Sequence, residues 1–416
     1  MTSRRGFIQG VTGSAGMLSL AAMVAPVRAQ VDEALTRIGG VPIRSQYLLD
    51  PELYYFNHAS IGTVPRPVHE AHVAYLRLCE TNPWLYVWGE PWELARAEVR
   101  DSLASYVGAD PTEIVLTHNT TEGFNLLANG LDLQPGDEVL FSSLNHSGAS
   151  QCWYNQGYRG IEVRRFDFPI SDVTSLSAED ILEIYQQQIG PRTRVLVFPH
   201  IDNLVGLRYP VARLAAMARA AGVEYIAVDG AQSVGMIDVD IGALGVDFYA
   251  ASPHKWLQAP KGTGFLYVRK ALQENIRPMW VTWGQNSWKG TQRVLEDYGT
   301  VDFPGILSVG DAIRYQQTLG MTAAMQRREA LRLTLLEMVD DAPSLRWLSP
   351  REPALATSIY SLEVSGVDSR ELAQRLYREL GIVMRAFGGD TINALRVSPN
   401  VESDAGDLQQ LIREIT

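Results

Sequence analysis

The sequence contains only two cysteines, Cys79 and Cys152. An exported protein could pair them, and only a structure can show whether their Cα atoms lie within bonding reach. From the sequence we predict two buried thiols. The chain also lacks any cluster of Lys and Arg, and its net charge is −11. Because a nucleic-acid backbone is bound by a basic face, we expect no nucleic-acid partner.

Repeats and long apolar segments are also missing. We find no internal repeat and no low-complexity tract, and after the first 30 residues no apolar run could span a bilayer. The 416 residues fit one large two-domain enzyme or two ordinary domains, with ample chain to bury a core.

The N-terminus differs from the rest of the chain. Residues 3–9 read SRRGFIQ, which resembles the twin-arginine export signature, and a weakly apolar stretch follows over 11–26. Residues 27–29 read VRA, a small-residue cleavage site before Gln30. This order predicts a twin-arginine signal peptide over 1–29, hence export to the periplasm by the twin-arginine machinery. A membrane anchor is the alternative, although the apolar stretch is short and contains Gly and Ser.

Strand and helix patterns alternate over most of the remaining chain. We predict strands at 114–117, 138–142, 161–166, 194–198, 225–229, 248–251 and 264–268, and helices between several of them, such as 178–188 and 210–221. This alternation predicts an α/β fold in which helices sandwich a mainly parallel seven-stranded sheet. From about residue 305 the pattern changes to a long helical region over 307–340 and a smaller α+β unit. We therefore expect a large domain over 46–305 and a small C-terminal domain over 306–416.

Two motifs in the large domain carry the chemistry. Residues 228–232 read VDGAQ, and residues 248–256 read FYAASPHKW. Alone, Asp229 reads as a turn or cap residue and Lys255 as a solvated surface group. Together, an acid at the end of one strand and a lysine just past a later one can face the same crevice at the carboxyl edge of a parallel sheet. Pyridoxal-5′-phosphate (PLP) chemistry needs this pair, a lysine that binds the cofactor and an acid beside the ring nitrogen.

The combined pattern resembles the class V aminotransferases of PLP fold type I. The resemblance implies that Lys255 holds the cofactor covalently and that Asp229 pairs with the pyridine nitrogen. It also implies that Gln232 binds the ring hydroxyl and that Ser252 and His254 contact the phosphate.

Three further segments match cofactor contacts of that family. Residues 116–123 read LTHNTTEG and enter a helix whose N-terminus suits a phosphate, with Thr120 and Thr121 as added donors. His146 follows the next strand, where the family stacks a ring on PLP. Residues 299–302 read GTVD, and Thr300 is expected to reach the neighbouring subunit's phosphate in a homodimer with shared active sites. Without a cofactor, residues 116–123 would be an ordinary capped helix, His146 a loop histidine with no ligand, and residues 299–302 a simple loop.

The predicted substrate site depends on an arginine that binds a carboxylate. Arg396, in the LRVSPN segment over 395–400, resembles the family's carboxylate-binding residue, and a guanidinium suits a planar carboxylate. Arg385 is a rival or a second anion site, and a surface arginine is the plain alternative for each. Asn203 and His58 complete the predicted substrate site, His58 within the FNHASIG segment over 56–62.

Within the family, residues 56–62, 254–257 and 259–269, together with the GTVD segment, look most like the isopenicillin-N-epimerase-like subgroup. The export signal is similar to that of the periplasmic PLP enzymes that tailor pyoverdine. Cysteine desulfurases need a mobile nucleophilic cysteine in the small domain, and none lies between Gly381 and Arg396.

We therefore expect a PLP enzyme that acts on the amino group or Cα of an amino acid or peptide-like substrate, with aminotransferase chemistry as the first hypothesis. Racemisation or epimerisation is the alternative, and a catalytically silent binding protein is a third. No metal is expected.

Overall fold

The computed structural model describes residues 43–88, 90–389 and 392–416. The predicted signal peptide over 1–29 lies outside these residues. In the described part of the chain, no helix is long and apolar enough to cross a membrane.

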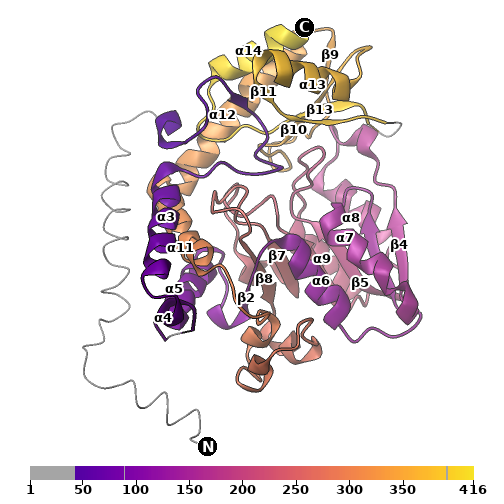
Figure 1. Cartoon of the computed structure of the whole chain (residues 1–416). Coiled ribbons are helices and arrows are strands. Elements are labelled where there is room, and N and C mark those ends of the chain that lie inside the picture. The colour runs from indigo at the N-terminus through magenta and orange to yellow at the C-terminus, as the bar shows by residue number, and fades with distance from the viewer. Residues whose placement is uncertain (1–42, 89, 390–391) are drawn as a thin grey trace, which may run out of the picture.

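A seven-stranded sheet forms the centre of the large domain, with the strand order β2-β8-β7-β6-β5-β3-β4 (Figure 1). Its strands are β2 (Ile114–Thr117), β3 (Glu138–Ser142), β4 (Glu162–Phe166), β5 (Thr193–Pro199), β6 (Tyr225–Asp229), β7 (Phe248–Ala251) and β8 (Gly264–Val268). β8 is antiparallel to both of its neighbours, and the other pairings are parallel. The prediction of a mainly parallel seven-stranded sheet is confirmed.

Side chains from alternate positions of each strand enter two separate apolar cores. In β5, Leu196 and Phe198 face one core, whereas Val195 and Val197 face the other. Because successive residues of a strand point to opposite faces, strands buried on both faces become continuously apolar. The sequence of β5 reads TRVLVFP for this reason.

Helices cover both faces of this sheet. One face packs against α6 (Thr120–Gly130) and α7 (Ser147–Tyr154). The other face belongs to the core shared with α3 (Arg66–Thr81), α5 (Glu90–Tyr106), α8 (Ala178–Gln186), α9 (Val211–Ala220), α10 (Ile241–Leu244) and α11 (Phe303–Leu319). The short helix α4 (Pro83–Trp88) lies between α3 and α5.

The small domain lies above the large domain in Figure 1. Its antiparallel sheet has the order β12-β13-β10-β9, with β9 (Leu345–Trp347), β10 (Tyr360–Val364), β12 (Arg385–Phe387) and β13 (Ala394–Val397). Its helices are α12 (Met321–Asp340), α13 (Ser369–Leu380) and α14 (Ala405–Ile415). A separate parallel pair joins β1 (Tyr54–Tyr55) to β11 (Ile382–Val383).

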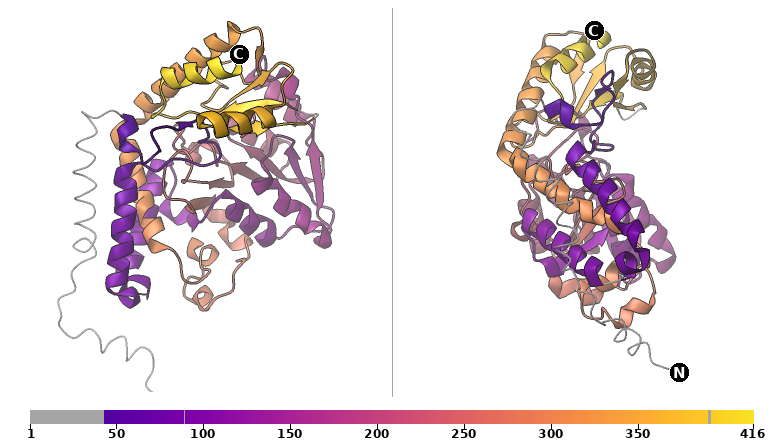
Figure 2. Two further views of the ribbon diagram at one scale, coloured as in Figure 1. Left: turned by 45° about the horizontal axis from the view of Figure 1, so that its top comes forward. Right: turned by 60° about the vertical axis from the view of Figure 1, so that its left-hand side comes forward.

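The helices at the junction of the two domains pack in different cores. The helical region over 307–340 is two helices, because Gly320 has a φ of +76° and ends α11. α11 packs in the large-domain core and α12 in the small-domain core, so the transition falls at Gly320 and not near 305. Figure 2 shows the two helices following one another along one side of the molecule. In addition, β1 and Phe56 belong to the small domain, although the sequence analysis assigned them to the large one.

The two cysteines lie on opposite sides of the central sheet. Cys79 is half-buried on α3, and Cys152 is buried on α7 among the residues of the other core. Both are free thiols, as predicted, and burial raises the pKa of Cys152 to about 12.

Candidate active site

The centre of the site lies where β6 and β7 end. Asp229 is the last residue of β6, and Lys255 follows the end of β7 at Ala251. The Asp229 side chain is buried, and its Oδ1 accepts a hydrogen bond from the Ala231 N–H at 2.9 Å. Its Oδ2 forms no hydrogen bond with any described residue, so this oxygen is free to bind a ligand. This is the residue type needed beside a pyridinium nitrogen.

Lys255 is held as a reactive amine. Its pKa is lowered to about 8, mainly by desolvation and to a smaller extent by the charge of Arg396, while the charge of Asp229 raises it. Its backbone is fixed because the Lys255 N–H donates to Ser252 O at 3.0 Å, while its Nζ forms no hydrogen bond with any described residue. A lysine that loses its proton this readily is a nucleophile and a base near neutral pH.

The pH dependence of cofactor binding should report this pKa. Only the neutral amine attacks an aldehyde, so the PLP association rate of cofactor-free enzyme should rise about tenfold per pH unit and level off above about pH 8. An unperturbed lysine would level off near pH 10.5. Asp229→Asn removes a charge that raises this pKa and should move the midpoint down; Arg396→Gln should move it up. Stopped-flow absorbance measures both, and a midpoint unchanged in both variants would contradict the electrostatic coupling.

Gln232 lies beside the lysine loop. Its Nε2 donates to Ala59 O at 2.8 Å, and its Oε1 accepts from the buried Trp256 Nε1 at 2.8 Å. One amide hydrogen and one lone pair remain for the predicted bond to the cofactor hydroxyl. Gln232 therefore also joins the loop after Lys255 to the segment around residue 59.

The N-terminus of α6 presents a cluster of donors. Asn119 caps the helix through the Glu122 N–H, and the Thr120 N–H donates to Ser252 Oγ at 3.1 Å. The Thr120 and Ser252 hydroxyls are 2.8 Å apart, so two residues predicted at the phosphate from different motifs meet here. The Thr121 N–H and hydroxyl have no hydrogen-bond acceptor among the described residues. These donors and the positive end of the helix dipole fit a phosphate dianion.

His254 and His146 are both held neutral. Burial is the main cause that lowers the pKa of His254 to about 4, and its Nδ1 lies 2.9 Å from Thr263 O, so Nδ1 carries the proton. Its Nε2 can donate to a phosphate only after protonation, which a bound dianion would favour. His146 caps α7, and its Nδ1 accepts from the Gly148 N–H at 3.0 Å. Desolvation is the main cause that lowers the pKa of His146, while the charge of Asp229 raises it and that of Lys255 lowers it.

Arg396 is a buried cation on β13. Its Nη1 donates to Asn203 O at 2.8 Å, and its Nη2 donates to Asn57 Oδ1 at 3.0 Å and Ser60 Oγ at 2.6 Å. All of these acceptors are neutral, and its Nε is buried without a partner. Burial lowers the pKa of Arg396 to about 9, so the group is still charged at neutral pH. A buried guanidinium without an acidic partner among the described residues fits a substrate carboxylate.

Arg396 is oriented by residues from two distant segments of the chain, one around Asn203 and the other over 56–62. Asn203 lies beside Arg396 and accepts a hydrogen bond from it through its backbone oxygen. The predicted contact of Asn203 with the substrate stays a prediction. The sequence analysis singled out the segment over 56–62 but chose His58, whereas Asn57 and Ser60 are the residues that bind the guanidinium. The residue types of this segment do not indicate which of its side chains face β13.

His58 does not line the crevice in this structure. It has no exposed surface, and its Nε2 lies 2.7 Å from Glu402 Oε1 and 2.9 Å from Thr63 Oγ1. Its ring packs between Tyr55 and Trp256. The predicted substrate contact is therefore replaced by a structural role, a buried contact between the His58 imidazole and the Glu402 carboxylate that joins the N-terminal segment to the loop before α14.

Loss of this buried contact should destabilise the enzyme. His58→Ala leaves the buried Glu402 carboxylate without its imidazole partner and should lower the free energy of unfolding by about 3 kcal/mol. Adding Glu402→Gln should restore part of this loss, because the unpaired charge disappears. Urea denaturation followed by fluorescence measures both, with the exposed His69→Ala as the control. A loss in His58→Ala equal to that of the control would refute the structural role.

Thr300 lies at an exposed loop away from the lysine. It follows Gly299, whose φ is +109°, and forms no hydrogen bond with any described residue. The preceding Tyr298 hydroxyl bonds to His118 Nε2, and His118 Nδ1 lies 2.7 Å from Glu122 Oε2 at the start of α6. This chain of contacts, which the sequence analysis missed, fixes the loop to the predicted phosphate helix. The predicted contact of Thr300 with a neighbouring subunit stays a prediction.

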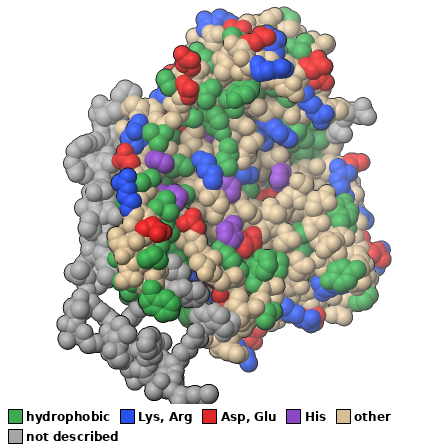
Figure 3. All heavy atoms as spheres, viewed as in Figure 1, with side chains coloured by type: hydrophobic (Ala, Val, Ile, Leu, Met, Phe, Trp, Pro, Cys, Tyr) green, Lys and Arg blue, Asp and Glu red, His purple; other side chains and the backbone are tan. Residues whose placement is uncertain are grey.

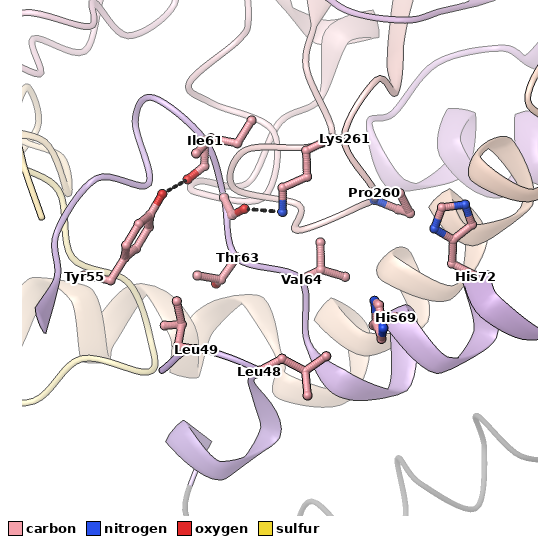
Figure 4. A pocket seen from close by; sticks show the side chains of 11 residues that line it. Leu48, Leu49, Tyr55, Ile61, Thr63, Val64, His69, His72, Pro260 and Lys261 are labelled. Carbon is pink, nitrogen blue, oxygen red and sulfur yellow. Dashed lines mark hydrogen bonds between the residues drawn. The ribbon is translucent and has the colours of Figure 1, made fainter. Parts of the chain in front are cut away.

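A separate cavity of about 500 Å³ lies between the segment over 48–64, α3 and the loop after the lysine. Figure 4 shows Tyr55 and Lys261 reaching the same segment, where they donate to Ile61 O and Gly62 O at 2.9 Å each. None of the residues predicted to contact the cofactor lines this cavity. Figure 3 shows histidine and basic side chains exposed in the middle of the face that is turned to the viewer, below the small domain.

Comparisons with known proteins agree with this geometry. The family model described as aminotransferase class-V matches residues 53–411. The isopenicillin N epimerase of Streptomyces clavuligerus is 31% identical over 88% of this chain and 95% of its own length. A probable cysteine desulfurase of Methanothermobacter thermautotrophicus is 27% identical over 82% of this chain and 86% of its own length. In fold, the chain is similar to a C-DES mutant with glycine covalently linked to its PLP cofactor. The TM-score is 0.81 at 24% identity, over 90% of this chain and 99% of that one.

Proposed function

The chain belongs to the class V aminotransferase family, and on this premise we propose that it transfers the amino group of an amino acid or amino-acid-like substrate. The family depends on PLP. The observation that carries the proposal is the arrangement of three residues: Asp229 ends β6, Lys255 follows the neighbouring β7, and Arg396 bonds to Ser60, two residues before Gly62, whose N–H donates to His254 O. The charges of Asp229 and Arg396 both act on the pKa of the lysine.

PLP, when bound, supplies an electron sink that makes the substrate Cα proton labile. The chain's own residues then divide the remaining work. Lys255 Nζ holds and moves the Cα proton, which its lowered pKa permits near neutral pH. Asp229 would hold the ring nitrogen in its protonated state. The α6 N-terminus with Thr120 and Ser252 would hold the phosphate, and Arg396 would orient the substrate by its carboxylate.

Spectroscopy of the holoenzyme with single amino donors tests this proposal. Amino transfer predicts that the visible absorbance of the lysine-bound cofactor falls, that the pyridoxamine form accumulates and that one equivalent of keto acid appears. Adding a keto acid alone should restore the starting spectrum. Donors that exchange their Cα proton for deuterium without releasing any keto acid would contradict amino transfer.

That last outcome would favour a second candidate, racemisation or epimerisation. The 31% identity to an isopenicillin N epimerase supports it. It needs a second acid–base group that returns the proton to Cα from the face opposite Lys255. Chiral chromatography of the recovered amino acid distinguishes the two reactions, because only epimerisation inverts the substrate without consuming it.

Desulfuration has less support from the residues of this chain. The sequence has no cysteine in the small domain, and Cys152 is buried on α7 with a raised pKa. A thiol in this state is a poor nucleophile.

We also propose export through the twin-arginine pathway and a homodimer with shared active sites. The residues over 3–29 support export, and the exposed Thr300 loop supports sharing. N-terminal sequencing of the mature protein should begin near Gln30, and light scattering should give twice the chain mass. An intact Met1 in a soluble cytoplasmic protein, or a monomer with full activity, would refute the respective proposal.

A further inference from the structure

Two arginines lie directly opposite each other in the small-domain sheet. β12 pairs with β13 in antiparallel register, and Arg385 is the partner of Arg396. Directly opposite residues of an antiparallel pair project from the same face, so the two side chains share one side of the sheet. Phe387, two residues after Arg385, shares that side. Its ring centroid lies 5.8 Å from the Arg385 guanidinium carbon and 5.7 Å from that of Arg396.

Fold stability does not explain this arrangement. Like charges directly opposite each other in a sheet are destabilising. Arg385 is exposed, and no described carboxylate lies within ion-pair distance of it. Other arginines of the small domain do have acidic partners: Arg346 with Glu363, Arg351 with Asp340, and Arg375 with Glu379.

Strand register and hydrogen bonds connect the two arginines to the lysine loop. Arg385 lies opposite Arg396, and Arg396 Nη2 donates to Ser60 Oγ at 2.6 Å. Two residues later, the Gly62 N–H donates to His254 O, next to the lysine, at 3.0 Å. The charges of Arg385 and Arg396 both lower the pKa of His146, a ring that also senses Asp229 and Lys255. The two arginines differ in setting, since Arg396 is buried and held by three neutral acceptors, whereas Arg385 is open to solvent at the edge strand of the sheet. Arg396 is therefore fixed in position to bind a group near Lys255, and Arg385 is free to bind a group farther along the substrate.

We infer that Arg385 is a second anion subsite, which selects substrates that carry a second carboxylate in addition to the one bound by Arg396. The substrate class is then a dicarboxylic amino acid, or a longer molecule with an acidic group on its side chain. This inference rests on the proposed function, because the position of Arg396 defines which carboxylate is the first.

Binding of carboxylic acids that lack an amino group tests the anion subsite separately from the proposed amino transfer. We would titrate holoenzyme with butyrate and with succinate, glutarate and adipate, and measure heats of binding by calorimetry. The wild type should bind the best diacid at least about tenfold more tightly than butyrate, because a second charge-assisted hydrogen bond forms. Arg385→Gln should abolish this preference and leave butyrate unchanged. Arg385→Lys should keep part of it.

Arg378→Gln is the matched control, because Arg378 is an exposed arginine of the small domain that bonds to Gln374 on its own helix. It should behave as the wild type does. Equal affinity for diacids and butyrate in the wild type would overturn the inference. So would equal weakening of both in Arg385→Gln, since Arg385 would then share a single carboxylate with Arg396.

Turnover gives an independent measure. The ratio of kcat/KM for the acidic amino donor to that for alanine should fall about tenfold in Arg385→Gln, with the spectrum of the lysine-bound cofactor unchanged. If no amino acid reacts but the diacid preference depends on Arg385, the proposed function fails and the subsite stands. If amino acids react with no such preference, the subsite alone fails.

Discussion

Lys255→Ala is expected to remove the visible absorbance of the lysine-bound cofactor and to lower kcat by about 10⁴-fold. The substitution deletes both the amine that binds PLP covalently and the base that moves the Cα proton. Among the described lysines, Lys261 is no ready substitute, since it donates to Gly62 O and lines the separate cavity, and since Asp229 acts on the pKa of Lys255 but not on that of Lys261.

Borohydride labelling checks the same assignment chemically. The chain has four lysines, Lys255, Lys261, Lys270 and Lys289, so the digest of the reduced holoenzyme gives few candidate peptides. The label should reside on the peptide that contains Lys255. Lys270→Ala is the control, because Lys270 is exposed and should keep the wild-type spectrum and rate. A label on Lys261, or none at all, would remove Lys255 from its role.

Asp229→Asn should lower kcat by about 10³-fold while PLP still binds. The asparagine can keep the hydrogen bond from the Ala231 N–H, so the local fold is preserved. It cannot supply the negative charge that holds a proton on the pyridine nitrogen, and the electron sink weakens. The rate loss should therefore fall on kcat, with a smaller change in KM.

Two measurements separate this electrostatic effect from a general loss of structure. A PLP analogue methylated on its ring nitrogen carries a fixed positive charge and should restore part of the activity of Asp229→Asn. Asp238→Asn removes an equal charge at an exposed position of the following loop and should leave kcat unchanged. If Asp238→Asn lowers kcat as much as Asp229→Asn does, the effect is one of net charge, and Asp229 has no special place.

Local patterns were sufficient for the architecture of the sheet. The strands β2, β3, β6, β7 and β8 have the bounds expected from the sequence, because residues buried on both faces form short apolar runs that end at turn residues. The reversed direction of β8 is not visible in such a run, since an apolar strand reads alike in both directions. The break at Gly320 was missed because a helix pattern tolerates a single glycine, and only the packing of α11 and α12 in different domains requires the break.

In the candidate site, too, the sequence predicted some residues and only the structure revealed the others. The sequence by itself determined which residue types stand at the strand ends, and so it identified Asp229, Lys255 and the Thr-Thr turn, whose chemistry depends on local backbone geometry. Only the tertiary structure decided which side of the segment over 56–62 faces β13, and it buried His58 against Glu402 while Asn57 and Ser60 took the guanidinium. The same holds for Arg385, whose place opposite Arg396 follows from strand register. Contacts between residues more than 300 positions apart depend on register and domain packing, which no local pattern encodes.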